Sequence, residues 1–212
     1  MLSFTIKRGS KIMKKGFTLA EILITLGIVG VVAALTLPGV VMSYQKKVYV
    51  AQLQRIYNQF VNGTKAVMAE NGLDSLKEAD SNLKKASTFL NKIVTVSRTG
   101  SASSVMASNY KSLNSDKDIP FKMAEGACVV VDTGASICME NMQASGYAVV
   151  YLDLNGQSKP NVIGRDFFNL VIEPSGKIQA VHGSKECKEG GSLYAGNYCL
   201  GTVRGENWTM DY

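Results

Sequence analysis

Hydrophobic residues dominate an early stretch of the chain. Residues 17–41, FTLAEILITLGIVGVVAALTLPGVV, hold one charged residue, Glu21. At about 1.5 Å per residue, this run would make a helix roughly 37 Å long, which exceeds the ~30 Å hydrocarbon core of a bilayer. The pattern therefore predicts a membrane-spanning helix over 17–41.

The next segment, 42–72, is amphipathic. Its apolar positions recur every three or four residues, with Gln, Lys, Arg and Asn between them, as one face of a helix requires. Asn71-Gly72 supplies a stop signal at the helix C-terminus. We therefore expect one continuous helix over about 17–70, whose second half packs on a globular domain. The striped positions are Tyr49, Leu53, Ile56, Phe60, Gly63 and Val67.

Residues 73–212 predict a head that combines helices with a sheet. Helical spacing covers 74–97, whereas 99–118, rich in Ser, Asn and Thr, is expected to be a surface loop. From Ala127 onward, short β-rich runs separated by turn residues predict an antiparallel sheet of about four strands. Residues 183–212 are expected to form an irregular, disulfide-pinned tail. The predicted fold class is α+β, with the long N-terminal helix packed on the sheet.

The positive charge is concentrated at the N-terminus. The net charge is +6, and five basic residues in 1–16, which hold no acidic residue, leave +1 for the rest of the chain. This balance argues against direct binding of nucleic acid by the head. Basic residues before an apolar run favour a cytoplasmic N-terminus and an exported head. The five are Lys7, Arg8, Lys11, Lys14 and Lys15.

All four cysteines lie in the C-terminal part of the chain. Their even number and clustering predict two disulfides formed outside the cytoplasm. Of the three possible connectivities, we expect Cys128 with Cys138 and Cys187 with Cys199, because these pairs close short loops. Zinc is the alternative, but neither pair has CxxC spacing or contains a histidine.

Residues 14–21, KKGFTLAE, join three features in a fixed order. Lys14 and Lys15 precede a glycine, an aromatic residue follows it, and Glu21 lies five positions into the apolar helix. A carboxylate in an otherwise uninterrupted membrane segment is rare. The stretch resembles the processing site of type IV prepilins, which is shared by pilins and by the pseudopilins of type II secretion and DNA uptake. The resemblance implies cleavage after Gly16 by a prepilin peptidase, then methylation of the new amino terminus at Phe17.

The resemblance also implies a pilin-like domain order and a structural function. Residues 1–16 would be the leader, 17–41 the transmembrane half of the helix, 42–72 its amphipathic half, and 73–212 the extracytoplasmic head. The subunit would sit in the inner membrane and join a pilus or pseudopilus with other subunits, driven by an assembly platform and its ATPase. Glu21 would pair with the amino terminus of a neighbouring subunit, because an unpaired carboxylate in hydrocarbon costs several kcal/mol.

Alternatives remain open at this point. Translation from Met13 would give a short leader of the kind usual in this family, whereas translation from Met1 adds twelve residues. Val32-Ala33-Ala34 fits a secretory cleavage site, although the apolar run is long for a signal peptide. The subunit could belong to a DNA-uptake or adhesion pilus as a minor pilin, or anchor a head that never polymerises. No enzyme is expected, because the single histidine, His182, has no nucleophile near it in the sequence.

One loop has the composition of a calcium site. Asp153, Asn155 and Asp166 surround two glycines and a proline within YLDLNGQSKPNVIGRDFF, residues 151–168. Oxygen ligands suit calcium, although the spacing is not that of an EF-hand. The resemblance adds that pseudopilins of type II secretion use a calcium site in their C-terminal region. A turn set by Asn155-Gly156 is the simpler reading.

Overall fold

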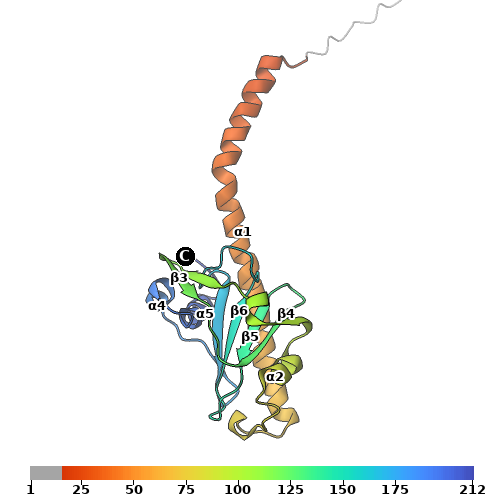
Figure 1. Ribbon diagram of the computed structural model, residues 1–212. Coiled ribbons are helices and arrows are strands. Elements are labelled where there is room, and N and C mark those ends of the chain that lie inside the picture. The colour runs from red at the N-terminus through yellow and green to blue at the C-terminus, as the bar shows by residue number, and fades with distance from the viewer. Residues whose placement is uncertain (1–15) are drawn as a thin grey trace, which may run out of the picture. The chain divides into compact units, whose positions relative to one another are not determined.

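The computed structural model describes residues 16–212, so the leader lysines Lys14 and Lys15 lie outside the described part (Figure 1). The chain divides into two compact units, Met1–Ser43 and Tyr44–Tyr212. Helix α1 runs over Leu19–Glu70. The long helix expected over about 17–70 is therefore present. Gly72 follows its end with a φ of +61°, a backbone conformation that glycine adopts readily because it has no Cβ.

The second half of α1 contributes one side of the head's core. Leu53, Ile56, Phe60 and Val67 of the predicted stripe are buried. Gly63 is a point of close approach, since a Cβ there would lie 2.8 Å from the Cγ2 of Ile93. The period of the sequence thus identified both the helix and the face that it buries.

The main sheet has six antiparallel strands in the order β1-β4-β5-β6-β7-β8. The expectation of about four strands was too low. It omitted the edge strand β1, whose central residues are exposed and carry no apolar run. The strands are β1 (Val96–Gly100), β4 (Gly126–Val131), β5 (Ser136–Glu140), β6 (Ala148–Asp153), β7 (Phe167–Ile172) and β8 (Ile178–Gln179).

The segment 74–97 is helical only in part. It holds the short 3-10 helix η1 (Leu76–Glu78) and α2 (Ala86–Ile93), and β1 begins at Val96. The Oγ of Ser75 accepts a hydrogen bond from the backbone N–H of Lys77 at 3.3 Å and so caps η1.

The polar segment 99–118 is not a surface loop. It contains the end of β1, the short helix α3 (Ala102–Val105), and the strands β2 (Asn109–Ser112) and β3 (Ser115–Pro120), which pair as a hairpin. Val105, Met106 and Tyr110 are buried, and the ring of Tyr110 lies 4.2 Å from that of Phe167. One buried aromatic residue anchors the segment, although its average composition is that of a loop.

The C-terminal segment 183–212 is also more regular than expected. It forms α4 (Ser184–Glu189) and α5 (Ala195–Gly205). Gly196 lets α5 lie directly on β7, because a Cβ there would be 2.8 Å from the backbone nitrogen of Asn169. The glycines that suggested an irregular tail instead permit close helix–sheet packing, and every residue of β7 is buried.

Candidate functional site

The start of α1 is a capping box that joins Thr18 to Glu21. Thr18 Oγ1 accepts a hydrogen bond from the backbone N–H of Glu21 at 3.2 Å. In return, Glu21 Oε2 accepts one from the backbone N–H of Thr18 at 2.8 Å and one from its hydroxyl at 2.9 Å. The T-x-x-E pattern is a known signature of helix N-termini, so the capping role of Thr18 is predictable from the sequence, although it is not among the expectations above. Within a single chain, the carboxylate of Glu21 is thus held at its own helix end.

The surface of α1 near this cap is apolar all round. Phe17, the residue after the expected cleavage point, is 84% exposed. Among the described residues, one helix, α1, is long and apolar enough to cross a membrane by length and composition. So large an exposed apolar surface requires lipid or other apolar helices around it. Its exposed members include Leu19, Leu23, Ile24, Leu26, Ile28, Val31, Leu35 and Val40.

The loop between β6 and β7 brings the three predicted oxygen-bearing residues together. Asp153 and Asp166 are completely buried. The hydroxyl of Tyr110 donates to Asp153 Oδ2 at 2.5 Å. Asp166 accepts the backbone N–H groups of Asn161 at 2.8 Å and Val162 at 2.6 Å, so its carboxylate shapes the loop.

Within the described part of the chain, the two carboxylates lack a cationic partner. Among residues 16–212, no ion pair within 4.0 Å involves Asp153 or Asp166. Burial, together with the nearby charge of Asp166, raises the pKa of Asp153 to about 8 against the lowering effect of the Tyr110 hydrogen bond. Burial also raises the pKa of Asp166. Two buried acids without a nearby cation are costly in the charged state, even though hydrogen bonds offset part of that cost.

Two amide oxygens in the same loop are shielded from water and unpartnered. They are Asn155 Oδ1 and Asn161 Oδ1. The side-chain N–H groups of Asn155 donate to the carbonyl of Lys159 at 3.0 Å and to the hydroxyl of Tyr49 at 3.3 Å. Sequence reasoning missed Asn161, whose place beside the acids depends on how the loop folds back.

These residues carry the type of ligand atom that calcium prefers. The two carboxylates and two amide oxygens offer six side-chain oxygens, and calcium takes 6–8 oxygen ligands. Each carboxylate oxygen that accepts one hydrogen bond retains a further lone pair. The described residues contain no group of three His, Cys, Asp or Glu that could hold a metal, so the amides are essential to this fit.

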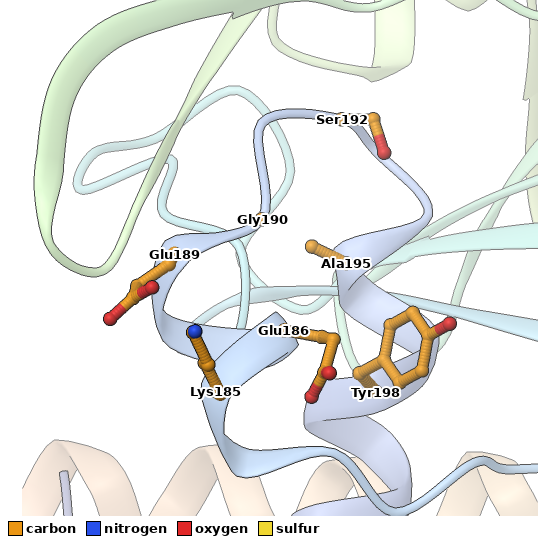
Figure 2. A pocket seen from close by; sticks show the side chains of 7 residues that line it. All are labelled: Lys185, Glu186, Glu189, Gly190, Ser192, Ala195 and Tyr198. Carbon is orange, nitrogen blue, oxygen red and sulfur yellow. The ribbon is translucent and has the colours of Figure 1, made fainter.

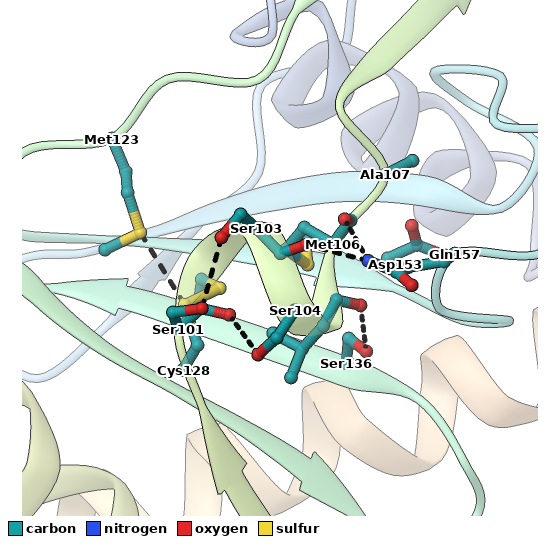
Figure 3. Close-up of a disulfide and its surroundings, with 12 residues drawn as sticks. Ser101, Ser103, Ser104, Met106, Ala107, Met123, Cys128, Ser136, Asp153 and Gln157 are labelled. Atoms are coloured by element: carbon teal, nitrogen blue, oxygen red, sulfur yellow. Dashed lines mark hydrogen bonds between the residues drawn. A yellow bond between two sulfur atoms is a disulfide. The ribbon is translucent and has the colours of Figure 1, made fainter.

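The cysteines form two disulfides, Cys128–Cys138 and Cys187–Cys199. This is the sequential pairing expected from the short loops. Cys128 and Cys138 are direct cross-strand partners on β4 and β5, with Cα atoms 4.1 Å apart. Figure 3 shows this bridge beside the serine-rich α3 segment, with Met123 facing the Cys128 sulfur. The second bridge joins α4 to α5 and so fixes the C-terminal region.

A pocket of about 360 Å³ is lined by residues of α4, of α5 and of the connection between them (Figure 2). Glu186 and Glu189 reach it from α4, and Tyr198 from α5. No lining side chain has a water-shielded polar atom left unpartnered. We therefore assign this pocket no ligand.

His182 is exposed in the segment that precedes α4.

The architecture is that of a pilin-like α+β protein: a long, apolar N-terminal helix, then an antiparallel sheet with two disulfides. Residues 12–37 match the family model of the prokaryotic N-terminal methylation motif. That motif is the hallmark of type IV prepilins and pseudopilins, and this chain carries it at the start of α1. No curated protein and no solved structure gives a significant match.

Proposed function

We propose that this protein is a structural subunit of a type IV pilus or of a type II secretion-like pseudopilus. A prepilin peptidase cleaves after Gly16, the new amino terminus at Phe17 is methylated, and residues 17–72 remain as the assembly helix. The head, 73–212, lies outside the cytoplasmic membrane. The subunit performs no catalysis, and the assembly platform with its ATPase supplies the energy.

The observation that carries this proposal is the match to the methylation motif over residues 12–37, which ends inside α1. Cleavage on the cytoplasmic side would remove the basic leader and keep the apolar helix. Copies of that helix could then cover one another's exposed side chains. The buried stripe of α1 supports the same division, since it leaves the first half of the helix for lipid or neighbours.

Intact mass and N-terminal analysis of the protein from its own membrane test the processing step. We expect a chain that begins at methylated Phe17 when the peptidase is active, and an unprocessed chain when it is deleted. A Gly16→Leu variant is the matched control, because it should remain uncleaved and keep its leader while its membrane helix is unchanged. An intact leader on the wild-type chain in cells with an active peptidase would contradict the proposal.

We further propose that the β6–β7 loop binds calcium through Asp153, Asn155, Asn161 and Asp166. The support is the pair of buried acids without a cation and the two unpartnered amide oxygens. A bound divalent ion would supply positive charge and would hold the two ends of the loop together.

Thermal unfolding with calcium and with a chelator tests this second proposal. Calcium at about 100 times its Kd should stabilise the protein by about 2.7 kcal/mol, which is several degrees in Tm. Asn161→Ala should greatly reduce that response, whereas Ser158→Ala, at an exposed position in the same loop, should retain it. An equal Tm with calcium, magnesium and chelator would count against a calcium site.

A further inference from the structure

A polar pocket of about 380 Å³ lies between the tip of the β2–β3 hairpin and residues 162–165. The backbone fixes both walls. The N–H of Lys111 donates to the carbonyl of Asn161 at 2.9 Å, and the N–H of Ile163 donates to the carbonyl of Lys111 at 2.8 Å. The N–H of Asn114 donates to the carbonyl of Lys188 at 3.2 Å, which ties the hairpin tip to α4. The pocket is therefore preformed, as ligand sites usually are.

Two cationic side chains line this pocket from opposite walls. Lys111 lies 3.2 Å from Asp116, but the side chain of Asp116 is fully exposed, and exposed ion pairs contribute little. Arg165 has no ion pair within 4.0 Å among residues 16–212. Within the described part of the chain, its Nε is shielded from water and lacks a hydrogen-bond partner. The guanidinium of Arg165 thus lines the pocket with a charge that no acidic group of residues 16–212 pairs, and an incoming anion can pair it.

We propose that this pocket binds a carboxylate presented by an acidic side chain of a partner protein. The planar guanidinium of Arg165 can donate two parallel hydrogen bonds to a carboxylate, and Lys111 can exchange Asp116 for the same group. Lys111, Arg165 and Asp116 together carry a net charge of +1, which one monoanionic carboxylate balances. This inference is independent of the proposed function, because it uses neither the N-terminal motif nor the assembly helix.

NMR of the ¹⁵N-labelled full chain in detergent micelles at low salt tests the proposal. The probes are acetate, acetamide, inorganic phosphate, and a short peptide with one Glu together with its Gln counterpart. We expect saturable shifts of the Arg165 Nε–H and of the amides of residues 113–116 with the Glu peptide. The Glu peptide should bind at least about tenfold more tightly than acetate, because flanking residues add contact.

Three results would overturn the proposal. Equal shifts with the Glu and Gln peptides would exclude carboxylate recognition. Acetate that binds as tightly as the peptide would assign the pocket to a free small carboxylate. Phosphate that binds more tightly than either at the same residues would assign it to phosphate instead.

Variants separate the guanidinium fork from charge alone. Arg165→Gln should weaken peptide binding at least about tenfold, whereas Arg165→Lys, which keeps the charge without the fork, should recover only part of it. Lys117→Gln removes the same charge from the same hairpin outside the pocket and should leave binding unchanged. Two outcomes would show that only general electrostatics attracts the peptide and would contradict a specific site. One is an Arg165→Lys variant that binds the peptide like wild type. The other is a Lys117→Gln variant that loses as much peptide affinity as Arg165→Gln.

Discussion

Replacing Glu21 with Gln is expected to lower incorporation of the subunit into filaments roughly 100-fold, a loss of about 3 kcal/mol for breaking a charge pair in an apolar environment. The physical reason is the proposed pairing of this carboxylate with the methylated amino terminus of a neighbouring subunit. The amount of the variant in the membrane should not change, because Gln is tolerated better than Glu in hydrocarbon. The measurement is the ratio of subunit in sheared or cross-linked filaments to subunit in the membrane.

The capping box makes this substitution informative. Gln at this position can still accept the Thr18 N–H, since capping boxes use Glu or Gln alike, so Glu21→Gln removes the charge and keeps the cap. Thr18→Val does the reverse and should cost about 1 kcal/mol of helix-end stability. Glu78→Gln, an exposed acid in the head, should behave like wild type. Normal filaments from Glu21→Gln would show that charge pairing does not drive assembly.

How much of the molecule the sequence predicted depends on how local the signal was. The long helix and its buried face follow from the spacing of Leu53, Ile56 and Phe60, which needs no knowledge of the rest of the chain. The disulfide between Cys128 and Cys138 was also within reach, because a turn between two strands brings nearby residues opposite each other. Helical periodicity and short disulfide loops involve residues that are close in sequence, and the predictions that rest on them agree with the structure.

The elements that were missed depend on tertiary contacts. Tyr110 makes an ordered hairpin of a Ser- and Asn-rich segment only because Phe167, far along the chain, packs against its ring. Gly196 appears in sequence as a helix breaker, yet α5 needs it there to approach β7. Tertiary packing overrides local propensity at such places.

The residues of the candidate sites also divide into those that a local sequence pattern predicts and those that only tertiary contacts reveal. Asp153, Asn155 and Asp166 are close in sequence, and their grouping was predicted. Asn161 joins them because the Asp166 carboxylate binds the backbone of the loop, which no local pattern reveals. The absence of a partner for Arg165 among residues 16–212 is likewise visible only once the possible partners in that range have positions.

The two halves of α1 should respond in opposite ways to the same substitution. Leu53 is completely buried in the core of the head, so Leu53→Ala should lower the free energy of unfolding by about 3 kcal/mol. Leu35 is 78% exposed, and Leu35→Ala should change that quantity by less than about 0.5 kcal/mol. Denaturant titration of the full chain in detergent can follow Trp208, whose ring lies 5.4 Å from that of Tyr57 on α1.

Assembly should reverse the order of these two variants. Leu35→Ala removes side-chain contacts that neighbouring helices would make in a filament and should lower assembly through lost packing, because lipid is already as apolar as leucine and adds no hydrophobic driving force. Leu53→Ala should assemble in proportion to the fraction of folded head, because its side chain faces the subunit's own core. Two results would contradict this division of α1 into a half that packs on the head and a half that packs on neighbouring subunits. One is an equal loss of head stability in both variants. The other is assembly that depends on Leu53 and not on Leu35.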